Sequence, residues 1–212
     1  MFDRDYGSTR GYPNESEYTY VKVDFYNNIA TYLSELSNTD MRSLEDLVQY
    51  NIDNVGSEGG TPGIHPAFGS GQDGFLAALA TKGVRDETYY AALSFCQRTS
   101  REEGIDAALA NGGDPVDVLL VPPDVAQSVQ LAAQAGYPVI TIPASVHARS
   151  GMPFGLAVMG TAFSEGVLVR YASAIEDLMV RSGSGFQRAR TRPRWEGYLT
   201  REVPVAFQCA GC

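Results

Sequence analysis

This 212-residue sequence predicts an α/β fold, and three observations carry that prediction. Short apolar runs at 118–121 and 139–143 have the composition of strands that are covered on both faces, and a third strand is predicted at 154–159. Segments with helical periodicity flank these strands, with Gly and Pro at the turns. Three strands cannot all have neighbours on both edges, so the pattern also predicts an α/β domain that is incomplete.

The N-terminal half is predicted to be helical after an irregular start. Residues 1–20 are polar and Tyr-rich without a period, and they predict loop or extended chain. Apolar residues at +4, +8 and +11 predict a helix over 24–36. Ser43 is predicted to cap a second helix, with Asp46 three residues later. The Gly- and Pro-rich run 56–74 predicts either a linker or a long loop over an active-site mouth, and we favour the loop.

The C-terminal half alternates helices and strands. Asp86 is predicted to cap a long helix that ends near Ala110, before Gly112, Gly113 and Pro115. A helix over 125–135 joins the first two strands, which predicts a right-handed parallel crossover. The third strand follows a short turn, so we expect it to lie antiparallel to the second. Ser164 is predicted to cap the last helix, and Gly183 follows its end.

Composition limits the classes of partner. The 16 basic and 25 acidic residues give a net charge of −9, which disfavours nucleic acid as a partner. No run approaches the roughly 20 apolar residues of a membrane span, and the N-terminus lacks a signal peptide's apolar segment. Among the three cysteines, Cys96 falls in a helical pattern, and Cys209 and Cys212 form a lone CxxC at the end. We therefore predict a reduced, cytoplasmic compartment and neither metal nor cofactor.

Seven segments of the chain occur in an order that resembles the amidase signature family. They are VKVDFYNNIATYLSEL, RSLEDLVQYN, the turn Gly71-Gln72-Asp73, REEGIDAALA, DVLLVPP, AGYPVITIPAS and GMPFGLAVMGTAFSEGVLVRYASAIE. The resemblance implies the C-terminal part of that family's mixed sheet, flanked by helices. It implies an irregular segment over 1–20, a partial amidase-signature domain over 21–183 and a polar tail over 184–212.

The resemblance also implies a chemistry whose residues this chain lacks. Family members hydrolyse carboxamide C–N bonds with a serine nucleophile, a second serine at a cis peptide and a lysine, in a Gly-rich Ser-Ser segment. The chain contains no Ser-Ser pair, so no catalytic residue carries over. We expect the chain to be inactive alone and to depend on a missing N-terminal half or on self-association. A small-molecule amide is the substrate that the resemblance implies for a full-length member.

The other residues that could take part in catalysis or binding are interpreted as structural or solvated. Lys22 and Lys82 are predicted to be solvated, and His65 and His147 to be surface or turn residues without a nucleophile elbow nearby. Solvation also explains four acidic residues near a helix end and a strand start, and four alternating arginines. These are Glu102, Glu103, Asp114 and Asp117, and Arg188, Arg190, Arg192 and Arg194. Three functions stay open: part of an amidase, a non-catalytic binding protein or half of a two-chain assembly, and an enzyme with a new site.

Overall fold

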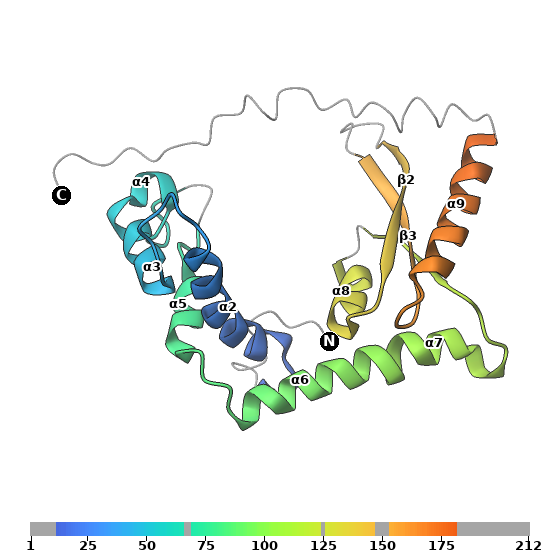
Figure 1. The fold of residues 1–212 in the computed structure, drawn as a ribbon, viewed down its shortest axis with the longest axis horizontal. Coiled ribbons are helices and arrows are strands. Elements are labelled where there is room, and N and C mark those ends of the chain that lie inside the picture. Colours follow the sequence, from blue (N-terminus) through green and yellow to red (C-terminus); the bar gives the residue numbers. More distant parts are fainter. Residues whose placement is uncertain (1–11, 66–68, 124–125, 147–152, 182–212) are drawn as a thin grey trace. The chain divides into compact units, whose positions relative to one another are not determined.

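The computed structural model describes residues 12–65, 69–123, 126–146 and 153–181. The chain forms two compact units that divide between Leu93 and Ser94. We refer to them as the helical unit and the sheet unit. Figure 1 shows the elements of each.

The helical unit packs short helices around one apolar cluster. Buried Leu44, Val48 and Ala78 form its centre, and the rings of Phe25 and Phe75 stack with centroids 5.5 Å apart. The elements are η1 (Pro13–Glu15), α2 (Glu17–Ser34), α3 (Leu44–Asp53), α4 (Val55–Glu58), α5 (Asp73–Thr81) and the first part of α6 (Glu87–Ser100). Helices α2, α3 and α5 surround this cluster.

Two expectations for this unit are wrong. Helix α2 begins at Glu17 rather than at residue 24, because Tyr20 and Val23 are buried and extend the apolar face towards the N-terminus. The run 56–74 is not all loop, since it contains most of α4, and α5 begins inside it at Asp73. The loop itself lies partly in residues 66–68, outside the described residues.

The predicted cap of α3 is confirmed as a reciprocal capping box. The Ser43 hydroxyl accepts a hydrogen bond from Asp46 N at 3.1 Å, and the Asp46 carboxylate accepts one from Ser43 N at 3.0 Å. Arg42 N also donates to Asp46 at 2.8 Å. The hydrogen bond from the Arg42 backbone is the main reason why the pKa of Asp46 lies below its ordinary value.

The predicted long helix is present, but its middle is wound differently. The sheet unit contains the end of α6, then the π-helical segment η2 (Arg101–Ile105), α7 (Asp106–Ala110) and the short turn η3 (Asn111–Gly113). Asp106 N–H bonds to Arg101 O, five residues back, where an α-helix uses the fourth. The left-handed residue that ends α7 is Asn111, with φ 46°, rather than Gly112.

A three-stranded sheet follows, with order β1-β3-β2. Its elements are β1 (Leu119–Val121), α8 (Ala126–Ala135), β2 (Val139–Val146), β3 (Pro153–Met159) and α9 (Glu165–Arg181). The predicted antiparallel pairing of the second and third strands is confirmed. Strands β1 and β2 point the same way, as a crossover requires, but β3 lies between them and pairs antiparallel with both.

Helices lie on both faces of this sheet (Figure 1). Ile142 and Val158 pack against Leu168 of α9 on one face. On the other face, Met159 packs against Ala132 of α8 and against Ile105. This arrangement confirms the α/β class.

The expectation that the first two strands are covered on both faces is wrong in part. Leu120, at the centre of β1, is 57% exposed, and Val139 at the start of β2 is 39% exposed. Both strands lie at the edges of the described sheet. Across the residues that the structure describes, no helix is both long and apolar enough to cross a membrane.

Candidate functional site

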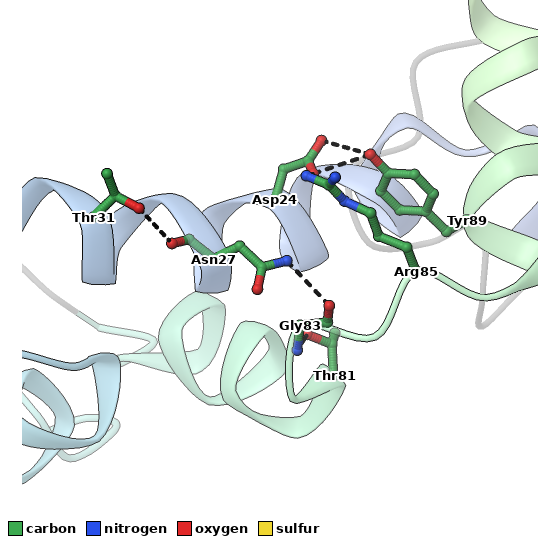
Figure 2. A network of polar contacts seen from close by, with 7 residues as sticks. All are labelled: Asp24, Asn27, Thr31, Thr81, Gly83, Arg85 and Tyr89. Carbon is green, nitrogen blue, oxygen red and sulfur yellow. Dashed lines mark hydrogen bonds and ion pairs between the residues drawn. The ribbon is translucent and has the colours of Figure 1, made fainter.

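Polar residues of the recognised segments meet partners far away in the sequence. In the helical unit, Asp24 of α2 accepts hydrogen bonds from Arg85 at 2.8 Å and from the Tyr89 hydroxyl at 3.0 Å (Figure 2). Tyr89 is buried, and this burial, then its hydrogen bond to Asp24, raises the pKa of its phenol. Nearby, Asn27 donates to Gly83 O at 3.0 Å. These contacts fix α2 against the start of α6.

The glutamine of the Gly-Gln-Asp turn also has a structural role. Gln72 is 7% exposed, and its amide donates to Val48 O at 3.2 Å. Its carbonyl oxygen accepts from Asn51 at 3.2 Å. Both partners lie in α3, so Gln72 ties the start of α5 to α3.

In the sheet unit, the segment REEGIDAALA is bonded to AGYPVITIPAS. The Tyr137 hydroxyl donates to Asp106 at 2.8 Å, and Arg101 donates to Ala135 O at 2.6 Å. The hydrogen bond to Asp106 raises the pKa of Tyr137. Two of the seven segments therefore form one structural joint.

A shallow cleft of about 390 Å³ borders this joint. Its polar walls include Asp106, Asp117, Thr161 and Ser164, and its apolar walls include Val116. The Tyr171 hydroxyl donates a short hydrogen bond to Asp117, and this bond raises the pKa of Tyr171. Each of the two carboxylates thus accepts a hydrogen bond from a tyrosine.

This cleft does not contain the parts of a nucleophilic site. The Ser164 hydroxyl donates to Thr161 O at 2.6 Å, and among the described residues that line the cleft none is a lysine, arginine or histidine. A serine nucleophile needs a base within hydrogen-bond reach. The two carboxylates of the cleft accept hydrogen bonds from Tyr137 and Tyr171, whereas the Ser164 hydroxyl donates to the Thr161 carbonyl oxygen.

The two lysines lie in surroundings that agree with a structural role. The Lys22 ammonium lies 4.8 Å from the centre of the Tyr18 ring. Lys82 ends α5 in the left-handed conformation, and its exposed ammonium lies 3.3 Å from Glu45. An exposed pair of this kind contributes little to stability.

The interpretation of His65 as a surface residue is wrong, because its exposed fraction is 1%. His65 lies in a bend of the chain, and its side chain is buried rather than solvated. Among the acidic residues, Glu103 pairs with Arg98 at 2.6 Å. Asp117 is held by Tyr171, as described above, so solvation alone does not explain it.

Several candidate residues lie outside the described residues: His147, Arg188, Arg190, Arg192, Arg194, Cys209 and Cys212. Cys96 is buried in α6. The described ranges contain no group of three His, Cys, Asp or Glu side chains that could hold a metal ion.

Comparison with known proteins shows which proteins this chain is similar to. A Schizosaccharomyces pombe protein named as an amidase is 50% identical over 202 residues, which are 92% of this chain and 33% of that protein. An Arabidopsis thaliana protein named as an amidase is 30% identical over 162 residues, or 73% of this chain and 27% of its own. The crystal structure of native peptide amidase from Stenotrophomonas maltophilia superposes with a TM-score of 0.62 at 29% identity, over 89% of this chain and 35% of that one.

The chain corresponds in sequence to a C-terminal portion of proteins that are named as amidases. No protein-family model matches it. The chain spans about a third of the length of the curated relatives it matches. The Asp24, Gln72 and Asp106 contacts account for three of the polar positions on which the resemblance was founded. The sequence identified these positions, but it did not reveal which residues they contact.

Proposed function

We propose that this chain is the part of an amidase that completes the fold, while the hydrolytic residues lie in a segment outside it. The observation that carries the proposal is the 50% identity over 92% of this chain to one third of a protein named as an amidase. The absence of a Ser-Ser pair from the sequence supports the assignment of catalysis to another segment.

The chain alone is expected to hydrolyse no amide. In its polar cleft the Ser164 hydroxyl donates to a backbone carbonyl oxygen rather than to a carboxylate, and Lys22 and Lys82 contact Tyr18 and Glu45 rather than a serine. In the assembled protein, the substrate is a carboxamide, and peptide amides are the first class to test because one structural neighbour is a peptide amidase. The cytoplasm remains the predicted compartment.

The test is a reconstitution. The chain is mixed with the segment of the fission-yeast relative that lies outside the match, and ammonia release from a peptide amide is measured for each part and for the mixture. Only the mixture is expected to release ammonia. Hydrolysis by the chain alone would overturn the proposal and indicate a site of its own.

A non-catalytic binding protein is the second candidate. The observation that favours it is the cleft between Asp106 and Asp117, which has hydrogen-bond acceptors and apolar walls that a ligand could contact. This function predicts that the chain is a cooperatively melting monomer that forms no complex with the amidase segment. Size-exclusion chromatography of the mixture separates the two candidates.

A further inference from the structure

Among the described residues, β2 forms ladder hydrogen bonds along one edge only. β2 ends the strand order β1-β3-β2. Just before it, Gly160 N donates to Pro138 O at 3.4 Å, and the same register continues into the strand. In an antiparallel ladder, every second residue bonds to the neighbouring strand and the residues between them face away. Ile140 and Ile142 therefore bond to β3.

The residues that face away from β3 are Val139, Thr141 and Pro143. Val139 and Thr141 each present an N–H and a C=O, whereas Pro143 presents only its C=O. All three side chains are exposed. The location of Pro143 agrees with this register, because proline at an inward position would remove a bond of the ladder.

This edge lacks the usual protection against strand pairing by charge. The strand reads VITIPASV and contains no charged residue, although natural edge strands often carry one. The opposite edge, β1, has three residues, and by the same alternation only Leu120 faces outwards within it. β2 is therefore the longer template for a further strand.

We propose that the outer edge of β2 pairs with an extended strand from the part of the amidase that lies outside this chain. The relatives supply the reason for this occupant, since the chain covers only 33% and 35% of the fission-yeast protein and of the peptide amidase. A strand added there gains main-chain hydrogen bonds at Val139 and Thr141. The inference rests on the proposed function and names the surface through which it is achieved.

Amide hydrogen exchange tests the edge directly. The chain is measured alone and with the fission-yeast segment that lies outside the match. The Val139 and Thr141 amides are expected to exchange rapidly in the chain alone and to slow by at least about tenfold in the mixture. The Ile140 and Ile142 amides, already bonded to β3, serve as internal references and are expected to be protected in both samples.

A pair of variants provides a matched control. Thr141→Pro removes an outward N–H without touching the ladder to β3, so the chain should keep its circular dichroism spectrum and bind the segment at least about tenfold more weakly. Thr141→Val keeps the N–H and should bind within about twofold of the natural chain.

The outcomes separate this inference from the function. A complex that hydrolyses amides but leaves the Val139 amide exchanging rapidly overturns the β2 edge and keeps the function. A complex in which the β2 edge is protected but which hydrolyses no amide supports the β2 edge and overturns the proposed function. Protection of the edge in the chain alone, with a doubled mass, means that two copies pair there. That result, or the lack of any complex, overturns the inference.

Phe163 carries a second inference independently. Its side chain is 95% exposed, and its backbone has φ 59°, a left-handed conformation that is unfavourable for a bulky residue. It stands between β3 and α9, immediately before Ser164. A side chain exposed to this extent is not stabilised by packing within the sheet unit.

The geometry points to Phe163 as an aromatic anchor for the same amidase segment, because buried aromatic side chains dominate many interfaces. Phe163→Gly relieves the backbone, so the isolated chain should unfold at the same or a higher denaturant concentration while the segment binds at least about tenfold more weakly. Phe163→Tyr keeps the ring and should bind normally. Unchanged binding by Phe163→Gly, or marked destabilisation of the isolated chain, would show that Phe163 has no such role.

Discussion

Asp24 receives hydrogen bonds from Arg85 and Tyr89, which lie 61 and 65 residues further along the chain. The Tyr89 side chain is buried and its bond to the carboxylate is partly buried, so this bond replaces bonds that water would make in the unfolded chain. The lysine and aspartate of the segment VKVDF thus have separate roles: Asp24 joins two helices, and Lys22 lies over a tyrosine ring.

Tyr89→Phe tests this joint. Removal of the hydroxyl should lower the free energy of unfolding by about 1 kcal/mol, because a partly buried hydrogen bond to the Asp24 carboxylate is lost while Arg85 remains. Urea denaturation is the measurement. Tyr32→Phe, at a side chain that is 58% exposed, is the control and should change stability by less than about 0.5 kcal/mol. Equal effects of the two changes would contradict the role assigned to Tyr89.

Tyr137 predicts a dependence on alkaline pH. Its hydrogen bond to Asp106 raises the pKa of the phenol in the folded chain above the ordinary value of about 10. The stability that this bond contributes is therefore complete below pH ~10 and is lost as the pH rises through the folded-state pKa. Thermal melting from pH ~9 upwards should show a smaller alkaline decline for Tyr137→Phe than for the natural chain. Parallel declines would count against this coupling.

At the scale of elements, the π-helical segment η2 places one glycine against backbone. A Cβ atom on Gly104 would lie 2.6 Å from Thr99 O, closer than carbon and oxygen can approach. Gly166, in the first turn of α9, has nothing within 4 Å of the same position. A side chain should therefore be poorly tolerated in place of Gly104 and well tolerated in place of Gly166.

Gly104→Ala and Gly166→Ala form a matched pair. Gly104→Ala should cost about 1–3 kcal/mol, because backbone must move to admit the methyl group. Gly166→Ala should be neutral or stabilise by up to about 1 kcal/mol, as alanine favours helix. Denaturation midpoints measure both, and a neutral Gly104→Ala would mean that η2 adjusts without strain.

The sequence predicts elements best where their signals are local. The Ser43–Asp46 capping box lies within four residues, and both its existence and its geometry agree with the prediction. Helix α5 was not predicted, because it begins directly behind a Gly-rich run and has a short apolar pattern. The position of β3 between β1 and β2 depends on packing against α8 and α9, which no local pattern encodes.

At the scale of the molecule, the same distinction applies to the candidate site. The recognised segments indicated an amidase portion, and the relatives confirm it. The hydrogen bonds that these segments make with distant residues include Asn51 with Gln72, 21 residues apart, and Asp24 with Tyr89, 65 residues apart. Partners at such separations are set by the complete fold, so they could not be read from periodicity or spacing.

Exposed apolar side chains give a prediction for the whole chain. Leu120, Phe154 and Phe163 are 57%, 44% and 95% exposed in the sheet unit. We expect the isolated chain to enhance the fluorescence of a hydrophobic dye, and the amidase segment to reduce this signal as it covers the surface. A chain that gives no dye signal and melts sharply as a monomer would contradict the view that part of its fold is missing.

The π-helical turn of η2 contains one residue more than an α-helical turn, and this affects which single-residue deletions the protein can tolerate. The helices on either side keep their facing directions despite the additional residue. Loss of the Gly104 codon should therefore leave a regular α-helix in which Ile105 still reaches Met159 and Asp106 still reaches Tyr137. We therefore expect a single-residue deletion to be better tolerated within η2 than elsewhere in this helical stretch.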